Sequence, residues 1–207
     1  MAINIVDETL ETGLQSVMTA EPGLQAVAIE IANWGILVVP VLLVALWFRG
    51  GTTGRQAAVT ATLAATLGLC IAGALSFVFY APRPFAIGLA PNLLDHVADS
   101  SFPSDHATVM AAVAVALIFG GRLPTGWLAL FATFAVGLSR VALGIHFASD
   151  IIAGMLLGAG VAFVFRIPSL ADFAEFCRSL AEALYVALGL EAAASRIHLQ
   201  KNKEITR

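Results

Sequence analysis

The residues best suited to chemistry lie in three short segments of an otherwise apolar chain. The segments are APRPF at 81–85, SFPSDH at 101–106 and SRVALGIHFASD at 139–150. Their ionisable and hydroxyl side chains include Arg83, Ser104, His106, Arg140, His146 and Asp150. Guanidinium forks and hydroxyl donors stabilise the charge that spreads over a phosphoryl group during transfer. The set therefore predicts a phosphate site.

The same segments contain a candidate nucleophile and a candidate acid. A neutral imidazole is a competent nucleophile when a carboxylate holds its other nitrogen. His146 and Asp150 are four residues apart, which places both on one face of a helix that begins there. We expect Asp150 to orient His146, and His106, on a different helix, to protonate the leaving oxygen. The first turn of that helix would add free N–H groups near Asp105 for an anion.

Several of these residues also have a structural alternative. Ser104 can be the N-cap of the helix that follows it, alone or in addition to binding phosphate. Arg83 can bind lipid headgroups, and Arg140 can be an interfacial anchor. Loop polarity explains His96 and Asp99 adequately, although direct contact with substrate is open for both.

The order RP…PSDH…SRxxxGxHFxSD resembles that of the type 2 phosphatidic acid phosphatase superfamily, whose signature is KxxxxxxRP, PSGH and SRxxxxxHxxxD. The resemblance covers 81–150. It implies a metal-independent reaction through a phosphohistidine, in which His146 is the nucleophile, Asp150 its partner and His106 the general acid. By the same correspondence, the phosphate contacts would come from Arg83, Arg140, Ser104 and the backbone of Asp105.

The sequence departs from the family signature at two positions. The lysine of the signature falls seven residues before the arginine, where this chain has Ser76. The phosphate pocket is therefore less positive than the family pattern, and another donor or water would have to substitute. The second departure is PSDH in place of PSGH. The aspartate, together with the surrounding residues 93–108, resembles a bacterial branch of the superfamily, the BcrC-type undecaprenyl-diphosphate phosphatases.

Composition indicates a membrane protein, so membrane-embedded helices must position these segments. The chain is 59% hydrophobic and only 12% charged, against about a quarter charged in soluble domains. We expect an all-α membrane bundle, because five stretches are long and apolar enough to be spans. They are residues 28–48, 57–80, 105–120, 124–142 and 147–166.

Amphipathic segments flank this core within one expected domain, residues 1–207. Residues 1–23 lack the basic start of a signal peptide and contain, over 3–19, an amphipathic pattern that predicts an interfacial helix. The transmembrane core then covers 24–167, and 168–207 forms an amphipathic, cytoplasmic tail.

The distribution of charge predicts the orientation. Loops on one side carry Arg49, Arg55, Arg122, Arg166 and the basic tail, whereas Arg83 and Arg140 are the basic residues of the other side. Positive charges favour the cytoplasmic side, so we expect the three chemical segments at the external face of a bacterial plasma membrane.

The expected function is hydrolysis of undecaprenyl diphosphate to the monophosphate, which recycles the cell-wall lipid carrier. The expected partners are this polyprenyl lipid and the bilayer, with no nucleic acid, because the net charge is −3. No cofactor or metal is expected. A phosphatase for phosphatidate or phosphatidylglycerophosphate is the alternative within enzymes, and a non-catalytic lipid or phosphate transporter is the alternative outside them. The oligomeric state is not predicted.

Overall fold

The computed structural model describes residues 5–190, which fold into α-helices joined by turns and one long loop. The helices are α1 (Ile5–Ala20), α2 (Pro22–Trp34), α3 (Val38–Arg49), α4 (Gly51–Val78), α5 (Asp105–Phe119), α6 (Leu123–Ala142), α7 (Ala148–Val164) and α8 (Pro168–Ala187), with 3₁₀ turns η1 (Gly35–Leu37) and η2 (Phe85–Ile87). No strand occurs within this range, so the expected all-α fold is confirmed.

The first long apolar segment is a composite helix made of α2, η1 and α3. Pro22 opens it at a position where a missing N–H costs nothing. Pro40 cannot donate to the carbonyl of Ile36, and the helix tightens into η1 around that residue. Gly51, with a φ of 61°, then reverses the chain into α4. Both helices begin several residues before the expected 28 and 57, because their polar first turns are already helical.

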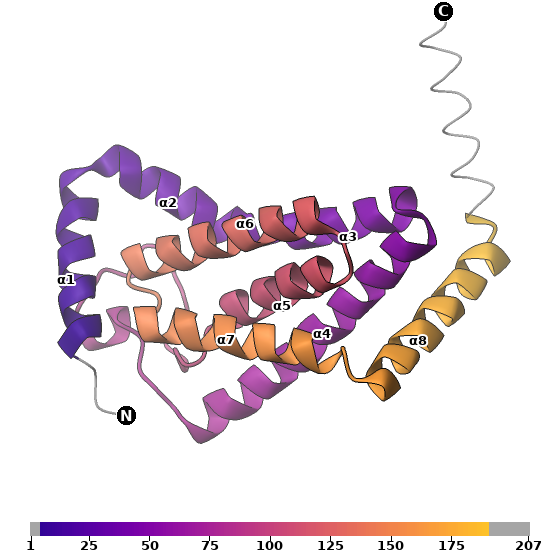
Figure 1. The fold of residues 1–207 in the computed structure, drawn as a ribbon. Coiled ribbons are helices and arrows are strands. Elements are labelled where there is room, and N and C mark those ends of the chain that lie inside the picture. Colours follow the sequence, from indigo (N-terminus) through magenta and orange to yellow (C-terminus); the bar gives the residue numbers. More distant parts are fainter. Residues whose placement is uncertain (1–4, 191–207) are drawn as a thin grey trace, which may run out of the picture.

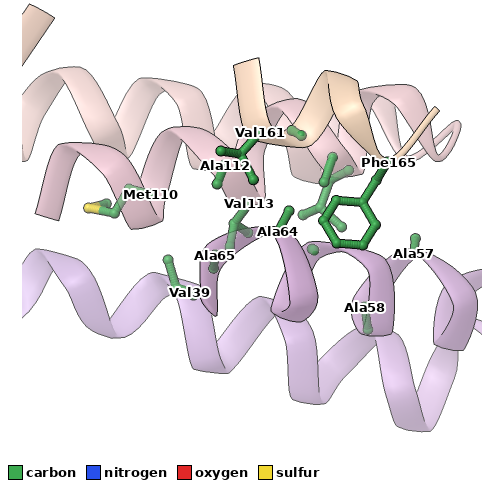
Figure 2. Close-up of a cluster of buried hydrophobic side chains, with 14 of the residues drawn as sticks. Val39, Ala57, Ala58, Ala64, Ala65, Met110, Ala112, Val113, Val161 and Phe165 are labelled. Carbon is green, nitrogen blue, oxygen red and sulfur yellow. The ribbon is translucent and has the colours of Figure 1, made fainter. Parts of the chain in front are cut away.

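Helix α5 lies at the centre of the bundle, packed against α4, α6 and α7 (Figure 1). It is apolar on all sides, as a helix surrounded by other helices must be. Its side chains, among them Met110 and Val113, belong to one cluster with small residues of α4 such as Ala64 and Ala65 and with Phe165 (Figure 2). The small side chains on α4 let the two helices approach closely.

Two glycines of α7 set its distance from α5. A Cβ added at Gly158 would lie 2.2 Å from the carbonyl oxygen of Thr108, and one at Gly154 would lie 2.6 Å from that of Ser104. The two helices therefore touch backbone to backbone. This contact holds the N-terminal ends of α5 and α7, where two of the chemical segments lie, at one level.

The outer surface of the bundle is apolar, as expected for a protein in lipid. Large side chains such as Phe77, Phe131 and Leu156 are exposed around it. Pro22–Arg49, α4 and α6 are long and apolar enough to cross a membrane, α7 qualifies only together with α8, and α5 is a shorter apolar helix. Each of the five expected spans thus corresponds to a helical segment, and their number as complete spans stays a prediction.

Helix α1 confirms the expected N-terminal helix, and its acidic residues face the bundle. It crosses the end of the bundle where α6 ends and α7 begins (Figure 1). Asp7 and Glu11 are buried against the bundle, whereas Val6, Leu10 and Val17 are exposed. The acidic face is turned inward because it hydrogen-bonds to the α6–α7 junction, as described below.

Helix α8 follows α7 after a bend of 85°. Pro168 is at its first turn and cannot continue the hydrogen bonding of α7. Phe173, Phe176, Leu180 and Leu184 are exposed along the helix. The described part of the predicted tail is therefore an amphipathic helix, and its basic run at 195–207 lies outside the described residues.

Candidate active site

A small polar cavity lies at the end of the bundle where α5 and α7 begin. Its volume is about 110 Å³, and it is lined by Arg83, His96, Asp99, Ser100, Pro103, Asp105, His106, Arg140 and His146. These residues come from the α4–α5 loop, the start of α5, the end of α6 and the α6–α7 loop. The structure thus brings the three chemical segments together.

The α6–α7 loop that carries His146 is fixed by backbone hydrogen bonds. The N–H groups of Ile145 and His146 both donate to the carbonyl of Arg140, at 3.0 and 3.3 Å. Gly144 has a φ of 69°, a backbone conformation that residues other than glycine rarely adopt. Its carbonyl accepts from the N–H of Phe85 at 3.1 Å, which ties this loop to the segment that contains Arg83.

The two ring nitrogens of His146 have different surroundings. Nδ1 lies 2.9 Å from the carbonyl oxygen of Ser101. A carbonyl can only accept, so Nδ1 carries the hydrogen and Nε2 of the neutral ring keeps its lone pair. Nε2 lies 3.2 Å from Nη1 of Arg83, a residue that lines the cavity. This tautomer is the one that a nucleophilic Nε2 requires.

Asp150 supports His146 less directly than the four-residue spacing predicted. Its Oδ2 is 3.8 Å from Nδ1, beyond hydrogen-bond distance. The same oxygen accepts the hydroxyl of Ser101 in a short hydrogen bond and the N–H of Phe147 at 2.9 Å. Asp150 therefore holds Ser101 and the start of α7, and Ser101 in turn contacts the ring.

Ser101 is the residue of this network that sequence reasoning missed. It is fully buried, and its hydroxyl lies 3.2 Å from Nδ1 of His146. A serine beside Ser100 in a polar loop has the same sequence signal as any loop residue. Its place directly before FPSDH was the one available hint.

Arg83 is buried and held from several sides. Its Nε donates to Asp99 at 2.8 Å, its Nη2 to the carbonyl of Ser100 at 3.1 Å, and its Nη1 to that of Ile145 at 3.1 Å. Burial alone would raise the pKa of Asp99, but the hydrogen bond from Arg83 holds that pKa below its usual range. Asp99 thus fixes the guanidinium beside His146, a role that loop polarity did not reveal.

Arg140 has no carboxylate within ion-pair distance in the described range 5–190. It is only 4% exposed, and its Nη2 lies 3.3 Å from Nε2 of His96. Its Nε is buried without any hydrogen-bond partner. A buried, unneutralised guanidinium that lines a cavity calls for an anion there.

Ser104 is the N-cap of α5, and its Oγ accepts from the N–H of Ala107 at 3.5 Å. It is fully buried and does not line the cavity, so the structure favours the capping alternative. Asp105 and His106 do line the cavity. Because they are the first residues of α5, their backbone N–H groups have no carbonyl partner within the helix. Such free N–H groups at a helix N-terminus form a binding site for an anion.

Ser76, which stands where the family signature has lysine, has a structural contact. Its hydroxyl donates to the carbonyl of Phe102 at 2.9 Å. The bond anchors the loop just before Pro103 and α5. Ser76 is not among the residues that line the cavity.

Helix α1 contributes two buried carboxylates behind the α6–α7 loop. Asp7 accepts from the N–H and the hydroxyl of Ser149, at 3.1 and 2.6 Å, and so caps the first turn of α7 from another helix. Gln15 donates to Glu11 at 2.9 Å and to the carbonyl of Ala142 at 3.0 Å. Burial raises the pKa of Glu11 to about 7, and the bond from Gln15 opposes this shift.

The electrostatic surroundings favour a neutral His146. Burial lowers the pKa of its imidazole below the ordinary value. The positive charges of Arg140 and Arg83 lower this pKa further, against the opposing effect of Asp150. The ring thus keeps a free lone pair at neutral pH. Within residues 5–190, no three His, Cys, Asp or Glu side chains are grouped as metal ligands would be.

The geometry has counterparts in known proteins. A family model for the PAP2 superfamily matches residues 57–170. YbjG of Escherichia coli (strain K12) is 37% identical over 155 residues, covering 73% of this chain and 78% of YbjG. Undecaprenyl-diphosphatase BcrC of Bacillus subtilis (strain 168) is 30% identical over 142 residues, covering 69% and 73%.

A solved structure has a similar arrangement of helices. It is the first transmembrane PAP2-type phosphatidylglycerolphosphate phosphatase from Bacillus subtilis, with a TM-score of 0.60 and 24% sequence identity. The match covers 82% of this chain and 85% of that one. At this identity the likeness shows the fold alone.

Proposed function

The chain belongs to the PAP2 superfamily, and from that membership we propose that it is a membrane phosphatase that hydrolyses undecaprenyl diphosphate to undecaprenyl phosphate. The observation that carries the reaction type is the cavity itself. Nε2 of a neutral His146 lies 3.2 Å from Nη1 of Arg83, and the same cavity is lined by Arg140, a buried guanidinium without an acidic partner among residues 5–190. The substrate is proposed from the relative named undecaprenyl-diphosphatase BcrC.

The proposed reaction has two steps. Nε2 of His146 attacks the terminal phosphorus, a P–N bond forms, and the bond from phosphorus to the bridging oxygen breaks. The electron pair stays on undecaprenyl phosphate, whose oxygen takes a proton from the imidazolium form of His106 and leaves that ring neutral. Water then attacks the phosphohistidine, the P–N bond breaks, and a proton of the water returns His106 to the imidazolium form. Inorganic phosphate leaves and the neutral imidazole of His146 is restored.

Side-chain and backbone donors that line the cavity bind the phosphoryl oxygens. Arg140 and Arg83 supply guanidinium donors, and the N–H groups of Asp105 and His106 supply a helix N-terminus. Donors that are fixed before the reaction stabilise the transition state without reorganising. Ser104 acts in this scheme by capping α5, rather than through direct contact with the phosphate.

The cavity accommodates a phosphate group rather than a whole lipid, since binding pockets for drug-sized ligands measure about 300–1,000 Å³. The polyprenyl chain would therefore remain in the bilayer beside the helices. We also propose that the cavity opens on the external side of the plasma membrane, with α8 on the cytoplasmic side. The arginine-rich ends at Arg49, Arg122 and Arg166 support this orientation.

The test is phosphate release by the purified full chain from undecaprenyl diphosphate, phosphatidate and phosphatidylglycerophosphate offered separately. We expect the highest kcat/KM for undecaprenyl diphosphate and no turnover by His146→Ala. Thermal unfolding of the variant serves as the folding control. Preference for a glycerolipid would overturn the substrate, and equal turnover by a folded His146→Ala would overturn the mechanism.

A further inference from the structure

A second cavity lies at the opposite end of the bundle from His146. Its volume is about 280 Å³, and it lies between the start of α4, the ends of α5 and α7, and the start of α8. The lining combines apolar walls with a few polar groups, chiefly Phe119, Phe165, Thr53, Gln56, Thr60 and Arg166. Helix α5 separates the two cavities, with Asp105 at one and Phe119 at the other.

Two arginines beside this cavity are not neutralised. Arg166 donates to the carbonyl of Phe119 at 3.2 Å, and its guanidinium lies 5.7 Å from the centre of the Phe119 ring. Arg122 donates to the carbonyl of Gly50 at 2.8 Å and to the hydroxyl of Thr53. Among residues 5–190, neither has a carboxylate within ion-pair distance.

Two other arginines at this end of the bundle are paired. Arg55 contacts Glu182 at 3.4 Å, and Arg178 forms ion pairs with Glu175 and Glu182. Arg49 is exposed and, among residues 5–190, has no carboxylate within ion-pair distance, so Arg122 and Arg166 are the unpaired arginines of this end that lie at the cavity. A ligand for the cavity should bring a negative charge.

One residue that lines the cavity, Gln56, has an acceptor that lacks a donor. Oε1 of Gln56 is buried and has no hydrogen-bond partner. The Nε2 group of the same amide donates to the hydroxyl of Thr60 at 3.4 Å, so the amide oxygen is the atom that lacks a hydrogen-bond partner. Buried acceptors are nearly always satisfied, so a ligand should also carry a hydroxyl or N–H group. Inorganic phosphate in its dianionic form has one hydroxyl, but it has no apolar part that could pack against the apolar walls of the cavity.

The position of α8 indicates where the cavity lies in a membrane. It leaves α7 at 85° and exposes Phe173, Phe176 and Leu180. An amphipathic helix of this kind lies in the interface, at the boundary of headgroups and acyl chains. The cavity at the α7–α8 bend is therefore at the depth of lipid headgroups, where basic pockets between helices bind anionic lipids.

We propose that this cavity is a binding site for an anionic glycerophospholipid whose headgroup carries a hydroxyl, such as phosphatidylglycerol. The phosphate lies at Arg166 with Arg122 at the edge, the hydroxyl donates to Gln56, and the acyl chains follow the apolar walls into the bilayer. A bound lipid would join α4, α5, α7 and α8 at the end remote from catalysis. The proposal does not depend on the substrate of the His146 site.

The test is lipid binding to the purified full chain, measured by native mass spectrometry and by thermal unfolding. We expect one saturable phosphatidylglycerol per chain, a raised Tm, and binding about tenfold or more weaker for Arg166→Gln. Arg49→Gln, which removes an exposed arginine at the same end, should bind as the wild type does. Phosphatase activity of Arg166→Gln in phosphatidylcholine micelles should remain, which shows that this variant is folded.

Further arms of the experiment separate the possible ligands. Phosphatidylethanol is anionic but lacks the headgroup hydroxyl, so it should bind more weakly than phosphatidylglycerol, and Gln56→Leu should remove this difference. Equal binding of phosphatidylcholine, equal binding by Arg166→Gln, or full competition by inorganic phosphate would each overturn the proposal.

Discussion

At the residue scale, several neighbours hold His146, the proposed nucleophile. The carbonyl of Ser101 fixes the tautomer of His146, and the Ser101 hydroxyl links the ring to Asp150. Burial and two guanidinium groups lower the pKa of His146. The ring thus enters the proposed reaction neutral, with Nε2 unprotonated and beside the phosphate donors.

We predict that Ser101→Ala lowers kcat while leaving KM nearly unchanged. The substitution removes the hydroxyl that links the His146 ring to Asp150, and we expect a loss of about 1–3 kcal/mol of transition-state stabilisation, equal to about 5- to 150-fold in rate. Ser101 does not line the cavity, so phosphate binding should persist. Steady-state kinetics with undecaprenyl diphosphate measure both constants. A rise in KM with unchanged kcat would contradict the role assigned to Ser101.

At the element scale, helix ends and helix contacts position the site. Helices α5 and α7 start at the cavity, α6 ends there, and α1 crosses behind the loop that carries His146. Glycines of α7 let it touch the backbone of α5. The cavity geometry thus depends on how closely these two helices approach.

Gly158→Ala tests this contact directly. The added Cβ would lie 2.2 Å from the carbonyl oxygen of Thr108, so we expect a loss of about 1–3 kcal/mol in the free energy of unfolding, with reduced activity. Gly160→Ala, in the same helix, meets nothing within 4 Å and should stabilise by about 0.5–1 kcal/mol. Thermal unfolding in detergent compares the two. Equal effects would argue against close α5–α7 packing.

Glu11 gives α1 a predicted pH dependence. Its pKa is raised to about 7 in the folded protein, from 4.5, so the folded state holds more protons between these values. Stability should therefore fall as pH rises from about 4.5 to about 7, and change no further from this group above that. Glu11→Gln, which cannot ionise, should show a flatter Tm against pH over this window. An unchanged slope would indicate that Glu11 ionises normally.

Part of this arrangement could be predicted from the sequence. The motifs identified His146, His106, Arg83 and Arg140, and the cavity brings them together. The length of the apolar stretches also predicted the α-helical fold. Both signals are local, since they depend on residue types at short spacing.

The rest depended on contacts between distant segments. Asp7 meets Ser149 across 142 positions of the chain, and no local pattern signals that contact. Asp7 and Glu11 face the bundle, which the amphipathic pattern of residues 3–19 does not indicate. The distance from Asp150 to His146 likewise depends on the loop that inserts Ser101 between them.

At the scale of the whole molecule, the bundle carries a catalytic cavity at one end and a basic cavity at the other. Helix α5 extends from the first to the second through an apolar core. Arg49, Arg122 and Arg166 all lie at the end remote from His146. This asymmetry underlies the proposed orientation in the membrane.

Cysteine labelling can test the orientation. In a background with Cys70 and Cys177 replaced by serine, Val97→Cys lies in the exposed loop at the catalytic end, and Leu123→Cys is exposed at the other end. We expect a membrane-impermeant maleimide to label Val97→Cys in intact cells and Leu123→Cys only after permeabilisation. The reverse pattern would place the catalytic cavity in the cytoplasm.

The most direct test of the central claim is capture of the phosphoenzyme. Undecaprenyl diphosphate labelled in its terminal phosphate is mixed with the purified chain, the reaction is quenched in alkali, and the label is located by peptide mapping. We predict an acid-labile, alkali-stable phosphate on His146 that is absent from His146→Gln. Labelling of His146→Gln equal to that of the wild type, or phosphate release with no labelled enzyme at any time, would contradict nucleophilic attack by His146.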